Sequence, residues 1–431
     1  MVDVVPFTGL LFDQEKTGPA DGFTAPPYDV ISPQQQDELY EKNAFNIVRL
    51  ILEKQYPEDD EQNNRYTRSS ATFKQWIEAK VLVKDEKPGF YVYSQEYTYE
   101  EQSVCRVGFF ARVRVEDFSA GNICPHEFTL AKAKQDRMKL LKACRANFSP
   151  VFGLFSDPAG EVDTRLNQAM KDQPLAVVEE NGILNKVWRL DDEETLGFIT
   201  EQFNDKKIFI ADGHHRYETA LNYHREHGDT VEDSAHVMMF LTNLDAQSLA
   251  IYPIHRLVKS PTPFDETDFM HQVENYFDVE PLDKGIGKEG VRELLESADE
   301  DNIVFSVYFG QDKGYFIKIK DKTNMLPLLT ADEPEELQVL DVAQLHTLLL
   351  KTILKVDTKD PHSQQYVTYK VDMDEALSRV DSGEFDMVFF MNATRIEQVR
   401  NLAEKGIRLP QKATFFYPKL LSGLVINKFE S

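Results

Sequence analysis

The sequence predicts an α+β protein in which helices cover mixed sheets. Some stretches alternate apolar and polar residues, as half-buried strands do, and others repeat apolar residues every three or four positions, as amphipathic helices do. The chain has 431 residues, which is more than one small hydrophobic core usually serves. We therefore expect two domains, an N-terminal α+β domain over residues 1–259 and a C-terminal α/β domain over residues 260–431.

The N-terminal domain is expected to mix strands and helices along the chain. Ser32 and Pro33 are residue types favoured at an N-cap and at a first helical position, so they predict a helix start. Residues 89–118 contain two alternating runs around the polar turn "EEQ", as a β-hairpin does. The same criteria predict strands at 45–52, 150–155, 176–180, 186–190, 208–211, 235–243 and 249–258, and helices at 126–146, 161–172 and 192–204.

The C-terminal domain is expected to begin after a turn-rich connection. Residues 260–268 contain two prolines and several turn formers, which favours a boundary there. Apolar spacing beyond this point predicts helices at 265–277, 289–297, 341–354 and 395–406, a hairpin over 302–320 and a strand at 386–392. In the tail, Lys412 and Lys419 lie among aromatic residues, where either a substrate clamp or ordinary surface packing fits.

Composition excludes several classes of protein. The chain has 48 Lys and Arg against 73 Asp and Glu, a formal net charge of -25, so it has no general supply of cations for a phosphate backbone. No apolar run reaches the roughly 20 residues of a membrane span, and the start lacks the features of a signal peptide. We expect a cytoplasmic protein with no nucleic-acid or membrane partner. The sequence does not indicate an oligomeric state.

The stretch "IFIADGHHRYETAL" carries the densest polar chemistry in the chain. A short apolar strand ends at Asp212, and a helix is expected to begin near Gly213. Glycine permits a positive φ and close approach of a ligand, and the first N–H groups of a helix favour an anion. His214, His215 and Arg216 add donors, and Arg216 can supply a forked, permanently charged one. The stretch predicts a phosphate site, although Asp212 acting as a cap beside solvated histidines is the simpler structural alternative.

Two further stretches offer acid-base groups. In "HEFTLAKAKQDR", His126 and Glu127 lie at or just before a helix start, where either acid-base or metal chemistry or plain capping fits. Asp136 and Arg137 in the same stretch fit a structural ion pair equally well. In "PPYDVIS", a proline-flanked loop presents Asp29, and such loops hold catalytic groups but also merely turn the chain.

Motifs of several large enzyme classes are not expected here. We find no GxxxxGK[ST] loop, no GxSxG and no HExxH, and we predict no GxGxxG turn that follows a strand. Serine hydrolases, P-loop nucleotidases and Rossmann dehydrogenases therefore lose their main support. The three cysteines are odd in number and form no CxxC, which suits reduced thiols.

Several stretches together resemble one known family. "ADGHHRYETAL", "APPYDVIS", "HEFTLAKAKQDR", "RANFSPVFGLF", "PIHRLV", "LDVAQLHTLLL" and "PQKATFFYPKLLSGLVI" resemble the bacterial and archaeal family catalogued as domain of unknown function number one thousand and fifteen. More distantly, the strand, the turn from Gly213 to Arg216 and the following helix look like the glycine-x-x-arginine turn of the ParB and sulfiredoxin superfamily. This resemblance implies a ParB/sulfiredoxin-like nucleotide-binding core.

The distant resemblance also implies a reaction. Members of the superfamily bind nucleotide phosphates at this turn, and some phosphorylate free serine, so Gly213, His214, His215 and Arg216 correspond to nucleotide-binding positions. ATP or ADP with Mg²⁺ is the implied cofactor. An acidic residue serves as base in the serine kinases. Glu127 or Asp29 is the candidate here, and His126 and Asp212 complete the candidate catalytic group.

The resulting hypothesis is a nucleotide-dependent phosphotransferase whose partners are a nucleotide and a small hydroxylated metabolite, with free serine or phosphoserine as the first candidate. A metal-dependent hydrolase with His126, His214 and Glu218 as ligands is one alternative, because His214 and Glu218 share a helix face at a spacing of four. A nucleotide-sensing regulatory protein without turnover is another.

Overall fold

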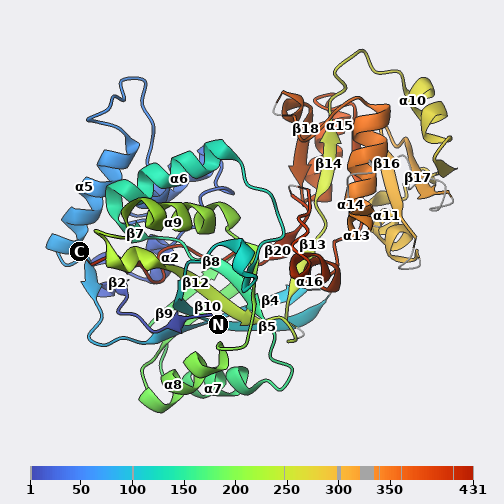
Figure 1. Cartoon of the computed structure of the whole chain (residues 1–431). Coiled ribbons are helices and arrows are strands. Elements are labelled where there is room, and N and C mark those ends of the chain that lie inside the picture. Colours follow the sequence, from blue (N-terminus) through green and yellow to red (C-terminus); the bar gives the residue numbers. More distant parts are fainter. Residues whose placement is uncertain are drawn as a thin grey trace. The chain divides into compact units, whose positions relative to one another are not determined.

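The computed structural model describes residues 2–99, 101–246, 248–298, 302–320, 334–338, 340–360, 362–410 and 412–430 (Figure 1). The contacts between Cα atoms divide the chain into two units. Unit 1 comprises Met1–Pro125, Thr129–Ala250 and Phe416–Ser431, and unit 2 comprises His126–Phe128 and Ile251–Phe415. The last segment of the chain therefore packs with the first unit, whereas a single domain boundary after residue 259 stays a prediction.

Unit 1 contains a mixed nine-stranded sheet within the described ranges. Its order is β6-β11-β8-β12-β5-β4-β10-β9, with β1 paired to β5. Strand β8 runs parallel to β12 and β6 runs parallel to β11, while the remaining neighbours are antiparallel. The strands are β1 (Val4–Val5), β4 (Phe90–Tyr99), β5 (Gln102–Arg114), β6 (Ile123–Cys124), β8 (Val151–Phe155), β9 (Ala176–Glu180), β10 (Ile183–Leu190), β11 (Ile208–Asp212) and β12 (His236–Asn243).

Helices lie on both faces of this sheet. Helices α5, α6 and α9 lie on one side, and α7 and α8 lie on the other (Figure 1). The helices of unit 1 are α1 (Gln14–Thr17), α2 (Ala20–Phe23), α3 (Pro33–Lys42), α4 (Val48–Ile51), α5 (Arg65–Glu78), α6 (Ala131–Cys144), α7 (Glu161–Ala169), α8 (Glu193–Gln202) and α9 (His214–His227), with 3-10 turns η1 (Phe118–Ala120) and η2 (Glu232–Ala235). Two small sheets pair β2 (Leu10–Phe12) with β3 (Leu82–Lys84) and β7 (Ala146–Asn147) with β21 (Asn427–Lys428).

The expected elements of unit 1 are largely confirmed. Ser32 caps α3 in a capping box, and β4 and β5 form the expected hairpin. The predicted strand at 45–52 is wrong, because the segment contains the short helix α4. Asn46 explains the difference: its side-chain oxygen accepts from the Val48 N–H at 2.9 Å, as a residue near a helix start does. The helix expected over 126–146 begins only at Ala131.

Unit 2 is built on an antiparallel six-stranded sheet within the described ranges. The order is β15-β17-β16-β19-β14-β18. The strands are β14 (His255–Val258), β15 (Phe277–Pro281), β16 (Val304–Tyr308), β17 (Gly314–Ile319), β18 (Val367–Lys370) and β19 (Met387–Phe390). A separate pair is formed by β13 (Ala250–Tyr252) and β20 (Phe415–Tyr417). The run expected as one strand at 249–258 is therefore two strands, and it is broken at Pro253, which lacks a backbone donor.

The two faces of the unit 2 sheet follow the alternation of strand side chains. Val304 and Phe390 face a core with α11 and α15, whereas Phe305 and Phe389 belong to the core that contains α10, α14, η4 and α16. The helical elements are α10 (Glu266–Val273), α11 (Gly287–Glu296), α13 (Glu335–Gln338), α14 (Asp341–Gln344), the π-helical segment η4 (Leu345–Ile353), the 3-10 turn η5 (Ser363–Tyr366), α15 (Met373–Asp381) and α16 (Ile396–Glu404). Both units mix helices with sheets, so the α+β class is confirmed.

One negative expectation is wrong. Gly285, Gly287 and Gly290 form a GxGxxG sequence that follows β15 and opens α11. The helix expected over 265–277 ends at Val273, and the chain then forms β15. A dinucleotide-binding fold does not follow from this motif, because β15 belongs to an antiparallel sheet rather than a parallel βαβ unit.

Arg106 ties the C-terminal segment to the sheet of unit 1. This residue of β5 is fully buried, and burial lowers the pKa of its guanidinium to about 10. It donates to the carbonyl oxygens of Tyr417 at 3.1 Å and Pro418 at 2.5 Å, and to the side-chain oxygen of Gln95. One cation therefore joins its cross-strand neighbour Gln95 to two consecutive carbonyl groups more than 300 residues later in the sequence.

We expect Arg106→Met to lower the free energy of unfolding by about 2 kcal/mol or more, because each buried acceptor left without a donor costs roughly 1–3 kcal/mol. Urea unfolding followed by circular dichroism measures this change. The control Arg292→Met removes an exposed pair with Glu289 and should change stability by less than about 0.5 kcal/mol. Equal stabilities of the two variants would contradict the role given to Arg106.

Candidate functional site

The turn between β11 and α9 requires a glycine. Gly213 has a φ of 89°, and a Cβ at this position would lie 2.9 Å from the Cζ atom of Arg216. Any other residue would meet both backbone strain and a collision with the guanidinium. Gly213 is the N-cap residue of the 14-residue helix α9 and makes no side-chain cap.

Asp212 lies between two cations at this turn. Its Oδ2 accepts from Arg216 at 2.5 Å, and its Oδ1 accepts from Lys419 Nζ at 2.6 Å. Arg216 also donates to the carbonyl oxygen of Pro150, which fixes the guanidinium from a second side. The three side chains together carry a formal charge of +1. The guanidinium of Arg216 is thus held in a defined position at the turn.

A cavity of about 50 Å³ in unit 1 is lined by Arg216 and by a second arginine, Arg137. Its other polar lining residues are Tyr28, Asn147, Ser149 and Thr219. Thr219 is 2% exposed, and its hydroxyl has no hydrogen-bond partner among the described residues. Because a water needs about 10–15 Å³ on this scale, the cavity has room for one phosphate-sized group. Two guanidinium groups and a buried hydroxyl favour an anion there.

Arg137 is held in a defined orientation. The centre of the Tyr28 ring lies 3.7 Å from its Cζ atom, which is a cation–π contact. The guanidinium donates to the carbonyl oxygen of Ile51 at 3.0 Å and to Asp136 Oδ2 at 2.7 Å. Burial raises the pKa of Tyr28, so this hydroxyl stays protonated at neutral pH.

Asp136 connects Arg137 to helix α5. Its Oδ1 accepts from the Tyr66 hydroxyl at 2.7 Å and from Arg65. Burial alone would raise the pKa of Asp136, but the nearby Arg137 and the hydrogen bonds from Tyr66 and Arg137 outweigh it and lower the pKa. The two cations Arg65 and Arg137 share this one carboxylate, so the formal charges of these three side chains sum to +1.

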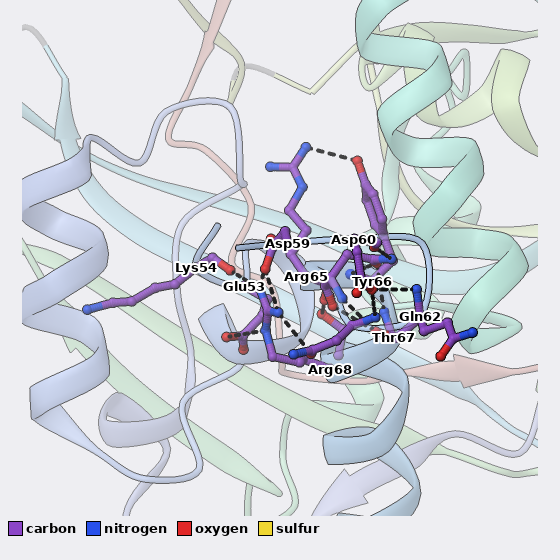
Figure 2. A network of polar contacts seen from close by, with 12 residues as sticks. Glu53, Lys54, Asp59, Asp60, Gln62, Arg65, Tyr66, Thr67 and Arg68 are labelled. Carbon is purple, nitrogen blue, oxygen red and sulfur yellow. Dashed lines mark hydrogen bonds and ion pairs between the residues drawn. The ribbon is translucent and has the colours of Figure 1, made fainter. Parts of the chain in front are cut away.

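The first turn of α5 is itself braced by a polar network, which Figure 2 shows around Arg65, Tyr66 and Arg68. Arg68 donates to both carboxylate oxygens of Asp59 at 2.7 and 3.1 Å and to the carbonyl oxygen of Lys54 at 2.7 Å. Asn64 caps the helix by accepting from the N–H groups of Tyr66 and Thr67. These contacts fix the start of α5, which carries Arg65 and Tyr66, two of the three residues that donate to Asp136.

The two histidines of the turn have different surroundings. His215 Nε2 accepts from the Leu130 N–H at 2.8 Å, so it satisfies a donor next to the start of α6. His214 is 5% exposed. Glu218, one turn later on α9, accepts from Thr129 Oγ1 and from Lys134 Nζ, both at 2.7 Å. Nucleotide contacts by His214 and His215 stay predictions.

The candidate acid-base residues are divided between the units. His126 and Glu127 belong to unit 2, where His126 Nε2 lies 2.8 Å from Thr414 Oγ1 and Glu127 accepts from the Ala413 N–H at 3.1 Å. Asp29 belongs to unit 1, is exposed and follows Tyr28 of the cavity lining. Asp29 and Asp212 thus belong to the same unit as the turn from Gly213 to Arg216. The catalytic roles of Asp29, Asp212, His126 and Glu127 stay predictions.

Among the residues that the structure describes, no group of three or more His, Cys, Asp or Glu side chains is arranged to hold a metal ion. Within the same ranges, no helix has both the length and the apolar character needed to cross a membrane.

Sequence analysis did not single out Asn147, Ser149 and Thr219 as site residues. Asn147 and Ser149 lie in the stretch "RANFSPVFGLF", whose polar residues precede the buried strand β8. That position at the start of a strand is the signal that marks them in the sequence. Thr219 lies on the second turn of α9, and only its orphaned hydroxyl in the folded chain distinguishes it.

Comparison with protein families gives one match over most of the chain. The family described as "Protein of unknown function (DUF1015)" matches residues 4–343. This finding confirms the family resemblance seen in the motifs. No curated protein sequence matches this chain at a significant level.

Several solved structures are similar at low sequence identity. A conserved hypothetical protein from Pyrococcus furiosus is 14% identical, with a TM-score of 0.37, and the match covers 75% of this chain and 95% of that one. A free serine kinase variant in complex with AMP is 13% identical, with a TM-score of 0.37 and coverages of 72% and 87%. C-terminally truncated SbnI from Staphylococcus aureus is 10% identical, with a TM-score of 0.34 and coverages of 73% and 85%.

The contacts of Asp136 predict a pH-dependent contribution to stability. Its pKa is lower in the folded chain than the ordinary value of about 4, so its stabilisation is complete above that value and is lost as the pH falls through the folded pKa. We expect Asp136→Asn to be less stable than the wild type by about 1–3 kcal/mol at pH 7, with the difference shrinking below pH of about 4.

Urea unfolding of both proteins between neutral and acidic pH measures this difference. The control Asp37→Asn removes an exposed pair with Lys54 and should give a small difference at every pH. A gap between wild type and Asp136→Asn that stays constant as the pH falls would show that the carboxylate charge does not stabilise the fold.

Proposed function

The chain belongs to the DUF1015 family, whose description names no activity, and we propose that it binds a nucleotide and transfers a phosphoryl group to or from a small hydroxylated metabolite. The observation that carries this proposal is the convergence of Arg137 and Arg216 on one phosphate-sized cavity beside the start of α9. Free serine or phosphoserine is the first candidate for the metabolite.

The charges around the cavity support phosphate as the bound group. In each arginine cluster two cations share one carboxylate: Arg216 and Lys419 share Asp212, and Arg65 and Arg137 share Asp136. Both clusters therefore keep a net positive charge after their internal pairing. Guanidinium donors and a hydroxyl are usual partners of phosphate oxygens.

The nucleotide is supported by the resemblance of the turn from Gly213 to Arg216 to the nucleotide-binding turn of the ParB and sulfiredoxin superfamily. The cavity of about 50 Å³ fits one phosphate group, so we expect the base and ribose to lie outside it. Among the described residues, no cluster of three or more acidic or histidine groups is available for a metal. Mg²⁺ would therefore bind mainly through the phosphate oxygens and neutralise part of their charge.

Phosphoryl transfer asks a protein chiefly to position the reactants and to stabilise charge. The substrate hydroxyl oxygen would attack the terminal phosphorus, a carboxylate would take the hydroxyl proton, and the bridging oxygen of the nucleotide would leave with the bonding electrons. Arg137 and Arg216 would orient the phosphate oxygens. The resemblance gives Glu127, which belongs to unit 2, as the first candidate for the base, and Asp29, which follows the cavity residue Tyr28 in unit 1, as the second.

We expect Arg216→Ala to weaken ADP binding at least tenfold, about the 1.4 kcal/mol expected from loss of one charged donor. Isothermal titration calorimetry with ADP and with ATP measures the affinity. The matched control is Arg225→Ala on the same helix, which removes an exposed pair with Asp117 and should leave binding unchanged. Unaltered affinity of a folded Arg216→Ala protein would remove Arg216 from the site.

We expect Glu127→Gln to lower turnover by ~10² or more with little effect on nucleotide affinity, as loss of a general base does. The assay incubates the protein with Mg²⁺, ADP or ATP and a panel of hydroxylated metabolites and their phosphates, and follows phosphorus by NMR. Asp29→Asn is tested in parallel.

Each outcome of this assay separates two hypotheses. Full activity of Glu127→Gln together with loss of activity in Asp29→Asn would move the base to Asp29. Nucleotide binding without transfer to any member of the panel would contradict the transferase and favour the nucleotide-sensing regulatory protein.

A further inference from the structure

Unit 2 contains a second cavity, which shares no lining residue with the arginine cavity of unit 1. Its volume is about 170 Å³, and it lies between the start of α11, helix α15 and the strands β16 and β19. An apolar protein cavity of about 150 Å³ accommodates a benzene molecule, so this one has room for a branched alkyl group or a ring. The apolar lining residues are Leu282, Ile286, Val291, Met373, Leu377 and Phe390.

A buried hydroxyl faces this cavity. Ser306 lines it and is 1% exposed, and its Oγ has no hydrogen-bond partner among the described residues. Ser306 pairs with Phe390 in the register of β16 and β19, so both side chains point to the same face of the sheet. A buried hydroxyl without a partner costs free energy, and a bound molecule that hydrogen-bonds to it would remove that cost.

The start of α11 offers donors on one side of the cavity. Gly285, Ile286 and Gly287 line it, and a Cβ built on either glycine would meet no atom within 4 Å. The N-cap residue Ile286 makes no side-chain cap to the 10-residue helix. The first turn of α11 therefore borders the cavity, and the N–H groups at a helix start suit a carboxylate.

The rim of this cavity carries negatively charged side chains. Asp283, Asp312 and Asp381 line the cavity, whereas its one lining cation, Lys288, is paired with Asp374. Asp381 is positioned by two donors to its Oδ1, the Tyr308 hydroxyl at 2.7 Å and the Gln311 N–H at 3.1 Å. A cationic group on the bound molecule would be attracted to these carboxylates.

We propose that this cavity binds a small zwitterion, a free α-amino acid with an apolar side chain. Its carboxylate would accept from the start of α11, its ammonium group would lie among the rim carboxylates, and its side chain would fill the apolar interior. Ser306 would donate to the carboxylate or accept from the ammonium group. The proposal is independent of phosphoryl transfer, because all of these residues belong to unit 2 and none lines the arginine cavity.

Isothermal titration calorimetry of the full chain tests this with three probes of similar shape: L-leucine, 3-methylbutylamine, which lacks the carboxylate, and 4-methylpentanoate, which lacks the ammonium group. We expect saturable binding of L-leucine and at least tenfold weaker binding of each analogue. Absence of saturable binding of L-leucine up to about 10 mM, or equal affinity for either analogue, would overturn the proposal.

Two substitutions locate the site. Ser306→Ala and Asp381→Asn should each weaken L-leucine binding about fivefold to tenfold, whereas Ser297→Ala, at the exposed end of α11, should leave it unchanged. Ser306→Ala removes only an unpartnered hydroxyl, so the variant should fold with an unchanged or higher melting temperature. ADP affinity should stay unchanged in all three variants. L-leucine binding that persists in folded Ser306→Ala and Asp381→Asn would place the amino acid elsewhere.

Discussion

A buried guanidinium group must find acceptors for its N–H donors, because its desolvation otherwise costs several kcal/mol. Both units of this protein depend on that requirement. Four buried or largely buried arginines each donate to at least one main-chain carbonyl oxygen: Arg106 to Tyr417 and Pro418, Arg137 to Ile51, Arg216 to Pro150, and Arg256 to Ile254 and Lys412. Most of these contacts join segments that are far apart in the sequence, so the buried cations help to define the tertiary structure of each unit.

The use of carbonyl oxygens has an electrostatic consequence. A carbonyl accepts a hydrogen bond without cancelling the formal charge of the guanidinium, whereas a carboxylate cancels it. Where carboxylates do take part, Asp136 and Asp212 each serve two cations. Although the chain has a formal net charge of -25, Arg137 and Arg216 each share their carboxylate with a second cation, an arrangement that suits an anionic ligand.

The sequence predicted the local elements better than the contacts between them. Alternation correctly placed the hairpin of β4 and β5 and the strand, turn and helix around Gly213, because each signal lies within a few neighbouring residues. The strand predicted for "FNIVRLIL" is wrong, since Ile47, Val48, Leu50 and Ile51 are all buried and periodicity cannot separate a short buried helix from a strand. Asn46 is the deciding residue there. Lys419 and Asp212 are separated by 207 residues in the sequence, so no local pattern encodes their ion pair.

In the candidate site, too, the sequence predicts the residues of a local motif but not those that the fold brings to it. Gly213 and Arg216 were found because they are adjacent to a strand end and a helix start, whereas Arg137 was seen only as one half of an ion pair. Arg137 lines the cavity because α6 packs beside α9, and this packing of two helices is not encoded in a local stretch of sequence. The roles of Glu127 and Asp29 depend on substrate position and stay predictions.

The return of the chain to unit 1 has a consequence for biosynthesis. Residues 251–415 form nearly all of unit 2, and residues 416–431 then complete unit 1. On the ribosome, the carbonyl groups that satisfy Arg106 and the strand β21 that pairs with β7 emerge after the entire inserted unit. Unit 2 can thus fold before residues 416–431 are available, and unit 1 becomes complete only when this segment docks against Arg106 and β7.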